Sequence, residues 1–119
     1  MAKKQRCYIY TRVSTELQID GYSLEAQKER LRSEAKHRKM QVCGEYSDEG
    51  KSGKNIAGRP EFKKMLSDIK SGKDDVDYVL VFKLSRFGRN AADTLNSLQF
   101  MEDYGVNLLC VEDGIDSAG

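Results

Sequence analysis

The chain has 119 residues, of which 39% are hydrophobic and 33% are charged. This composition is typical of one globular domain, because it is too apolar for a disordered chain, and one Pro and ten Gly argue against a linker or a fibrous protein. The longest apolar run, at 78–82, is far shorter than the roughly 20 residues of a membrane span, and the first residues contain no signal-peptide core. The chain has three cysteines, an odd number, and they lack metal-ligand spacing. We therefore expect all three to be reduced thiols that pack inside a cytosolic protein.

The formal net charge of +1 conceals an uneven distribution of charge along the chain. All 20 Lys and Arg residues lie within 1–90, together with 13 acidic residues, which gives this part a net charge of +7. Residues 91–119 contain six acidic residues and no Lys or Arg. Such asymmetry is a known hint of contact with nucleic acid, but helices with solvated charged faces explain it equally well.

Hydrophobic patterns predict four strands, the first of which spans 7–12 and is followed by a polar loop over 15–22. The other strands are predicted at 42–46, 78–82 and 106–111. The segment 78–82 is apolar without interruption, as in a strand that is buried on both faces. The polar, Gly-rich segment 47–58 is predicted to be a mobile loop.

Three amphipathic helices are predicted between these strands. The first runs from Leu24 to about Lys39, with Ser23 as its N-cap. The second begins at Pro60, which suits a first helical turn, and ends at Gly72. The third spans about 91–104.

The alternation of strands and helices predicts an α/β fold with three layers: a mostly parallel central sheet of four or five strands, with helices on both faces. In such sheets, ligands bind beyond the carboxyl ends of the strands. Four unusual segments follow the predicted strands, at 12–18, 47–59, 83–90 and 112–116.

Several kinds of site do not fit these segments. Residues 50–52 resemble the end of a phosphate-binding P-loop, but the glycine that this motif requires would fall at Glu45, and no dinucleotide motif follows the first strand. The acidic residues within 74–77 precede a strand and so lie at the wrong edge, whereas Asp113 and Asp116 lack a partner cluster. The single histidine, His37, lies among basic residues at a helix end, where we expect it to be solvated.

Arginine is the residue type that gathers at the predicted carboxyl ends of the strands. Guanidinium groups match phosphate oxygens, and a hydroxyl among them suggests phosphoryl transfer with serine as the nucleophile. Ser14 lies two residues after Arg12, and without a suitable histidine its activation would depend on the positive field or on Lys83. The alternative is that these arginines pair with surface carboxylates. The four arginines are Arg12, Arg59, Arg86 and Arg89.

Three blocks of sequence carry a more specific signal. They are YTRVST at 10–15 with SLEAQ at 23–27, DEGKSG at 48–53 with GRP at 58–60, and KLSRFGRN at 83–90. In order and spacing these blocks resemble the catalytic domain of the serine recombinases, which include resolvases, invertases and large serine integrases. The four residues 19–22, an insertion relative to small resolvases, resemble the large integrase branch.

The resemblance implies a site-specific DNA recombinase that uses no metal and no other cofactor. Ser14 would attack a DNA phosphodiester and form a 5′-phosphoserine intermediate, which is followed by strand exchange and religation. The implied partners are double-stranded DNA attachment sites and further copies of the protein in a dimer or tetramer, with no membrane. The four arginines would surround the phosphate, and the supporting polar residues would be Gln18, Gln27, Lys83 and Ser85.

The resemblance also leaves some questions open. Small resolvases carry Asp where this chain has Ser85, which could bind Arg86 or a phosphate oxygen, or could simply be a helix N-cap. Family members continue into an interface helix and a DNA-binding region, so we expect residues 1–119 to be the catalytic domain of a longer recombinase. The alternatives are a non-catalytic oligomerisation or regulatory module of the same fold, and a metal-dependent nuclease.

Overall fold

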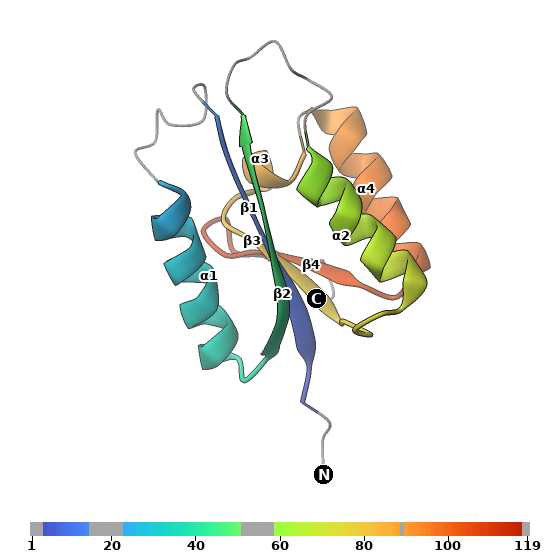
Figure 1. The fold of residues 1–119 in the computed structure, drawn as a ribbon, viewed down its shortest axis with the longest axis horizontal. Coiled ribbons are helices and arrows are strands. Elements are labelled where there is room, and N and C mark those ends of the chain that lie inside the picture. The colour runs from blue at the N-terminus through green and yellow to red at the C-terminus, as the bar shows by residue number, and fades with distance from the viewer. Residues whose placement is uncertain (1–3, 15–22, 51–58, 89, 118–119) are drawn as a thin grey trace.

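The computed structural model describes residues 4–14, 23–50, 59–88 and 90–117 (Figure 1). Within these ranges, five strands form one sheet in the order β2-β1-β3-β4-β5, which is parallel except for the antiparallel pair β4–β5. The strands are β1 (Arg6–Ser14), β2 (Gln41–Gly50), β3 (Tyr78–Val81), β4 (Asn107–Cys110) and β5 (Ile115–Asp116). The helices are α1 (Leu24–His37), α2 (Pro60–Ser71), α3 (Leu84–Phe87) and α4 (Ala91–Asp103). The predicted three-layer, mostly parallel architecture is confirmed.

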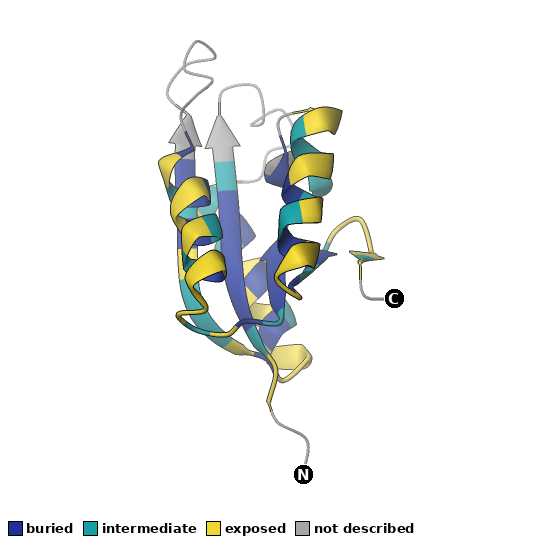
Figure 2. Cartoon of the chain, turned by 90° about the vertical axis from the view of Figure 1, so that its right-hand side faces the viewer, coloured by how far each residue is buried: buried dark blue, intermediate teal, exposed yellow. Residues whose placement is uncertain are grey.

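The sheet separates two hydrophobic cores. Helix α1 lies on one side of it, and α2 and α4 lie on the other (Figure 1). Ile9 and Leu80 pack with Leu31 of α1, whereas Tyr10 and Val79 pack with the residues of α2 and α4. Because successive side chains of a strand point to opposite faces, β1 and β3 supply both cores, and residues 7–11 of β1 and all of β3 are buried. Figure 2 shows these buried strands between helices whose outer surfaces are exposed.

Strands β1 and β2 extend further toward the candidate site than their sequences predict. The expected loop over 47–58 is wrong for 47–50, which belong to β2 and pair with residues 11–14 of β1, while 51–58 lie outside the described residues. The hydroxyl groups of Thr11 and Ser47 lie 2.7 Å apart across this pairing. A polar, Gly-containing strand end of this kind is fixed by its partner strand rather than by hydrophobic alternation.

The predicted helix ends are largely confirmed. The Ser23 hydroxyl accepts a hydrogen bond from the backbone N–H of Ala26 at 3.1 Å, and Asn90 caps α4 in the same way. Helix α2 begins at Pro60 and is closed by Gly72 in the left-handed conformation, at φ 73°. Left-handed backbone at this position allows the last carbonyl groups of a helix to be satisfied, and glycine adopts it without steric cost.

Two short elements, α3 and β5, are absent from the sequence prediction because both are too short to show a periodic pattern. Ser85 lies inside α3, whose N-cap position is Lys83, so the interpretation of Ser85 as an N-cap is wrong. Asp113, for which the sequence showed no partner cluster that could hold a metal, accepts a hydrogen bond from the backbone N–H of Leu84 at 2.7 Å. This bond ties the start of α3 to the turn that follows β4.

The single histidine and the three cysteines lie within the described residues. His37 is exposed in the last turn of α1. The three cysteines are free, and burial raises the pKa of Cys7 and of Cys110 to about 12, so these thiols stay protonated near neutral pH. In the described part of the chain, no helix is long and apolar enough to cross a membrane, and no three His, Cys, Asp or Glu residues are grouped to hold a metal ion.

Candidate active site

Ser14 is the last residue of β1, and its backbone lies opposite Gly50 at the end of β2. This position is the carboxyl end of the parallel sheet, where ligands bind in folds of this class. The side chains of Ser14, Ser85 and Arg86 lie outside the described part of the structure, as do the whole of Gln18 and Arg89. The candidate site is therefore built from the groups around the end of β1.

Arg12 lies on β1 two residues before Ser14 and is half-buried. Its Nη2 donates a hydrogen bond to the backbone carbonyl of Gly88 at 3.3 Å. Gln27, fully buried on the first turn of α1, donates from Nε2 to the carbonyl of Arg12 at 3.3 Å. The first block of the sequence is thus joined through Arg12 to the segment that follows β3.

Arg59 reaches the same segment from another direction. It occupies the N-cap position of α2, and only 7% of its surface is exposed. Its Nη1 donates to the backbone carbonyl of Phe87 at 2.5 Å, and its Nη2 forms an ion pair with Asp93 of α4 at 2.6 Å. The guanidinium carbon lies 4.0 Å from the centroid of the Phe62 ring, as in a cation–π contact.

Arg12 and Arg59 therefore bind consecutive backbone carbonyl groups, those of Gly88 and Phe87. The two arginines come from different blocks of sequence, and the carbonyl groups belong to the third block. Three segments that are far apart in the chain meet at one edge of the sheet. The backbone of α3, with Lys83 at its N-cap position and half-buried, lies in this same group of segments.

Asp48 holds the start of α2 in place. This carboxylate is 4% exposed, and it accepts hydrogen bonds from the backbone N–H groups of Glu61 and Phe62, each at 3.1 Å. Because Arg59 offers no side-chain acceptor at the N-cap, Asp48 supplies from β2 the acceptor that an N-cap residue would normally provide. Asp48 also accepts the hydroxyl proton of Tyr10 at 2.8 Å, and burial together with this carboxylate raises the pKa of Tyr10.

A row of three aromatic rings, those of Tyr10, Phe62 and Phe87, packs beside these polar groups. The ring of Phe62 packs edge-on against Tyr10 and against Phe87, with centroid distances of 5.0 and 5.5 Å. All three rings are buried. Edge-to-face pairs of this kind are favourable, and they join β1, α2 and the α3 segment through packed rings.

Gly88 allows the third block to lie against α4. A Cβ atom at this position would lie 2.9 Å from both Cα and Cβ of Thr94, a distance that side chains do not tolerate. The backbone of Gly88 is extended, at φ −119°, so the requirement is for space rather than for an unusual conformation. The close approach brings α4, and with it Asp93, within reach of Arg59.

Sequence reasoning identified the arginines but missed the carboxylates that position them. A signal for Asp48 was present, because the residue immediately before Pro60 is Arg59, which offers no side-chain acceptor to the first turn of the helix. Asp93 gave no local signal, because its partner Arg59 lies 34 residues away in the chain. The alternative of pairing with surface carboxylates holds in part for Arg59: it pairs with a carboxylate, but the partner is the half-buried Asp93.

Comparison with known proteins agrees with this geometry. Residues 7–119 match the family described as "Resolvase, N terminal domain". A resolvase family site-specific recombinase from Streptococcus pneumoniae is 64% identical, with a TM-score of 0.86 over 97% of this chain and 77% of that one. The N-terminal catalytic domain of TP901-1 integrase is 32% identical, with a TM-score of 0.82 over 97% of this chain and 83% of that one.

A relative from Pseudomonas putida, named "Resolvase/recombinase", is 29% identical over 114 residues. The alignment covers 96% of this chain but only 55% of that protein, so the chain spans about half the length of this relative. The family match covers nearly the whole chain, and the fold agrees with solved catalytic domains of the same kind. The chain belongs to the resolvase N-terminal domain family and is a serine recombinase catalytic domain.

Proposed function

We propose that this chain is the catalytic part of a site-specific DNA recombinase in which Ser14 is the nucleophile. The observation that carries the proposal is the convergence of Arg12 and Arg59 on the adjacent carbonyl groups of Gly88 and Phe87. This convergence gathers the three blocks at the end of β1, where the Ser14 backbone lies. A hydroxyl beside preorganised guanidinium groups suits attack on a phosphodiester.

The proposed reaction conserves the energy of the phosphodiester bond. The Oγ of Ser14 attacks the phosphorus atom and loses its proton, and the bond from phosphorus to the 3′ oxygen breaks. The 3′ oxygen takes up a proton and leaves as a hydroxyl, while the 5′ phosphate stays bound to Ser14. Attack of a new 3′ hydroxyl on this phosphoserine reverses each step and joins the exchanged strands, so the chemistry requires no metal and no nucleotide.

The other residues have supporting roles in this proposal. The guanidinium groups stabilise the charge that spreads over the phosphate oxygens in the transition state, and loss of one such donor typically costs about 10²–10³ in rate. Lys83, at the N-terminus of α3, lowers the pKa of the attacking hydroxyl or protonates the leaving oxygen. Gln27 holds the backbone of Arg12, and Gln18 and Ser85 bind the DNA phosphate. The arginines of this set are Arg12, Arg59, Arg86 and Arg89.

The whole protein in which these residues act is also part of the proposal. Because the chain spans about half of its Pseudomonas putida relative, we propose that a longer protein supplies the DNA-binding region that selects attachment sites. Serine recombination exchanges strands between two duplexes, so the proposed active form contains more than one copy of the catalytic domain.

The test detects the covalent intermediate and its polarity. The chain, and the full protein that contains it, are incubated with sheared DNA from the genome that encodes them and then denatured with detergent. A 5′-phosphoserine bond gives protein-linked DNA whose 5′ ends are blocked and whose 3′ hydroxyl groups are extended by a polymerase. We expect such adducts for the natural chain in excess chelator, and none for Ser14→Ala.

Controls separate this reaction from its alternatives. Ser71→Ala removes a hydroxyl at the far end of α2 and should leave the yield of adduct unchanged. Adducts with blocked 3′ ends would contradict the proposed polarity. Cleavage that disappears with chelator would indicate a metal-dependent nuclease, and equal DNA binding without any adduct in either protein would indicate a non-catalytic module.

A further inference from the structure

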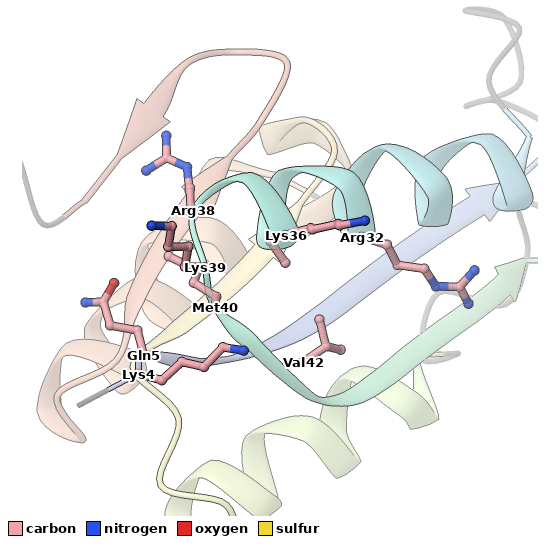
Figure 3. A pocket seen from close by; sticks show the side chains of 9 residues that line it. Lys4, Gln5, Arg32, Lys36, Arg38, Lys39, Met40 and Val42 are labelled. Carbon is pink, nitrogen blue, oxygen red and sulfur yellow. The ribbon is translucent and has the colours of Figure 1, made fainter. Parts of the chain in front are cut away.

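A pocket lies where β1 and β2 begin, at the amino end of the sheet, whereas the candidate active site lies at the carboxyl end. Figure 3 shows the side chains that line this pocket. Its volume is about 870 Å³. Its lining includes three apolar residues, Ala35, Met40 and Val42, which we call its floor. Five cationic side chains surround it: Lys4, Arg32, Lys36, Arg38 and Lys39. We call this feature the basic hollow.

The positive charge of the basic hollow is only partly neutralised. Arg32 forms two hydrogen bonds with Glu45, at 2.7 and 2.8 Å, and Arg38 bonds to Glu34 at 2.6 Å. The remaining cations are three lysines, Lys4, Lys36 and Lys39, and among the residues that the structure describes none of them makes an ion pair. The hollow therefore offers three positive charges around an apolar floor.

The end of α4 carries an excess of negative charge. Its last turn contains no basic residue, although cations normally stabilise the negative end of a helix dipole. Glu102 and Asp103 are exposed there, and both add negative charge. The next residue, Tyr104, is 44% exposed, and its ring lies against Phe100 with a centroid distance of 4.9 Å. We call Glu102, Asp103 and Tyr104 the acidic end.

These two surfaces cannot meet within one chain. The basic hollow lies on the face of the sheet that α1 covers, and the acidic end lies on the face that α2 and α4 cover (Figure 1). The sheet separates these two faces. Any pairing of the two surfaces must therefore join different molecules.

We propose that the basic hollow receives the acidic end of a second copy of this chain. Glu102 and Asp103 would meet the three unpaired lysines, and the exposed ring of Tyr104 would cover the apolar floor. The occupant is a polypeptide rather than DNA, because a phosphate backbone would match the lysines but would leave the floor in contact with charged groups. This contact is independent of the chemistry proposed for Ser14.

The geometry of the contact follows from its two different surfaces. Two copies can each insert their acidic end into the other and form a symmetric pair, or one copy can bind the next in a continuing series. Because the net charge of the chain is only +1, overall repulsion between copies does not oppose either arrangement. Since the attraction is largely between exposed charges, it weakens as salt is added.

The test measures self-association by sedimentation at low and high salt, about 50 and 500 mM. The first variant, Lys36→Glu with Lys39→Glu, and the second, Glu102→Lys with Asp103→Lys, should each weaken association at low salt at least about tenfold. Mixing the two variants should restore association, because each then offers the charge that the other lacks. Rescue of this kind cannot come from loss of folding.

The control, Lys63→Glu with Lys64→Glu, makes the same charge change on the exposed face of α2 and should leave association unchanged. Absence of association in the natural chain, or failure of the mixture to associate while both variants remain folded by circular dichroism, would overturn the proposal. So would variants that associate normally but lose binding to sheared plasmid DNA in a mobility-shift assay, since the hollow would then be a DNA contact.

Discussion

The two ends of the sheet use positive charge in opposite ways. At the carboxyl end, Arg59 is almost completely buried and is fixed by a backbone carbonyl, a carboxylate and an aromatic ring. At the amino end, Lys36 and Lys39 are exposed and lie on the rim of the basic hollow. The positive charge of Arg59 is packed inside the fold beside a carboxylate, whereas the positive charges of Lys36 and Lys39 are exposed and do not contribute to the packing of the fold.

This difference shows why composition alone gives little information about a site. The arginines at the carboxyl end suit a reaction because their partners hold each guanidinium in one orientation, as stabilisation of a transition state requires. Flexible lysines around an open hollow attract a partner but do not position a reacting group. Substitutions at the carboxyl end should therefore affect both stability and chemistry, whereas substitutions of the lysines at the amino end should affect association and leave the chemistry unchanged.

The largest expected effect is that of Arg59→Lys on chemistry. Lysine keeps the charge but loses the fork of donors that binds Phe87 and Asp93 together, so the rate of adduct formation with DNA should fall by about 10²–10³. Arg38→Lys makes the same exchange at the amino end and should leave this rate unchanged. Equal rates for Arg59→Lys and the natural chain would show that a positioned guanidinium is unnecessary.

Asp48→Asn tests whether the carboxyl end is held together by its buried carboxylate. An amide has only one acceptor oxygen, so it cannot satisfy the hydroxyl of Tyr10 and both N–H groups of α2. We expect the free energy of unfolding in urea to fall by about 3 kcal/mol. Glu102→Gln at the amino end is the matched control and should change it by less than about 0.5 kcal/mol. A similar small change for both variants would contradict the comparison.

Gly88→Ala tests the close approach of the third block to α4. The added methyl group would collide with Thr94 and move α4, and Asp93 with it, away from Arg59. The cost to the free energy of unfolding should be about 2 kcal/mol, as for other overpacked sites. Thr94→Gly together with Gly88→Ala removes the colliding side chain and should recover part of this loss. Unfolding in urea measures both effects.

The sequence was sufficient for elements whose signal is local. The caps at Ser23 and Gly72 and the buried strand at 78–82 follow from residue type and periodicity. The structure confirms them, with the strand ending one residue earlier, at Val81. The end of β2 could not be predicted, because its polar residues are held by pairing with β1. Such pairing depends on the assembled sheet and leaves no local pattern.

The candidate site divides in the same way. The three blocks identified the residue types and the edge at which they would lie, but not the carboxylates that fix them. Asp48 acts on a helix that begins twelve residues later, and Asp93 acts on an arginine in another block. These interactions are products of the tertiary fold, and only coordinates reveal them. The roles of Ser14 and its arginines in the reaction stay predictions until the adduct is tested.

The smallest expected effect concerns the end of α1, where Lys39 closes the helix with a positive φ of 59°. The N–H of Lys39 donates to the carbonyl of Lys36, and the N–H of Met40 donates to the carbonyl of Ala35. The end of α2 has the same arrangement, with Gly72 at φ 73° in the place of Lys39. A side chain in this conformation costs about 1 kcal/mol, a penalty that glycine does not have. Lys39→Gly should therefore raise the free energy of unfolding by about 0.5–1 kcal/mol, whereas Lys39→Ala removes the same charge, keeps the Cβ atom and should give no gain.

Both variants should weaken self-association equally, because the basic hollow loses the same lysine in each. If Lys39→Gly gained stability and still associated like the natural chain, the lysine would serve neither the fold nor the hollow, and the contrast between the two ends of the sheet would have to be drawn without it.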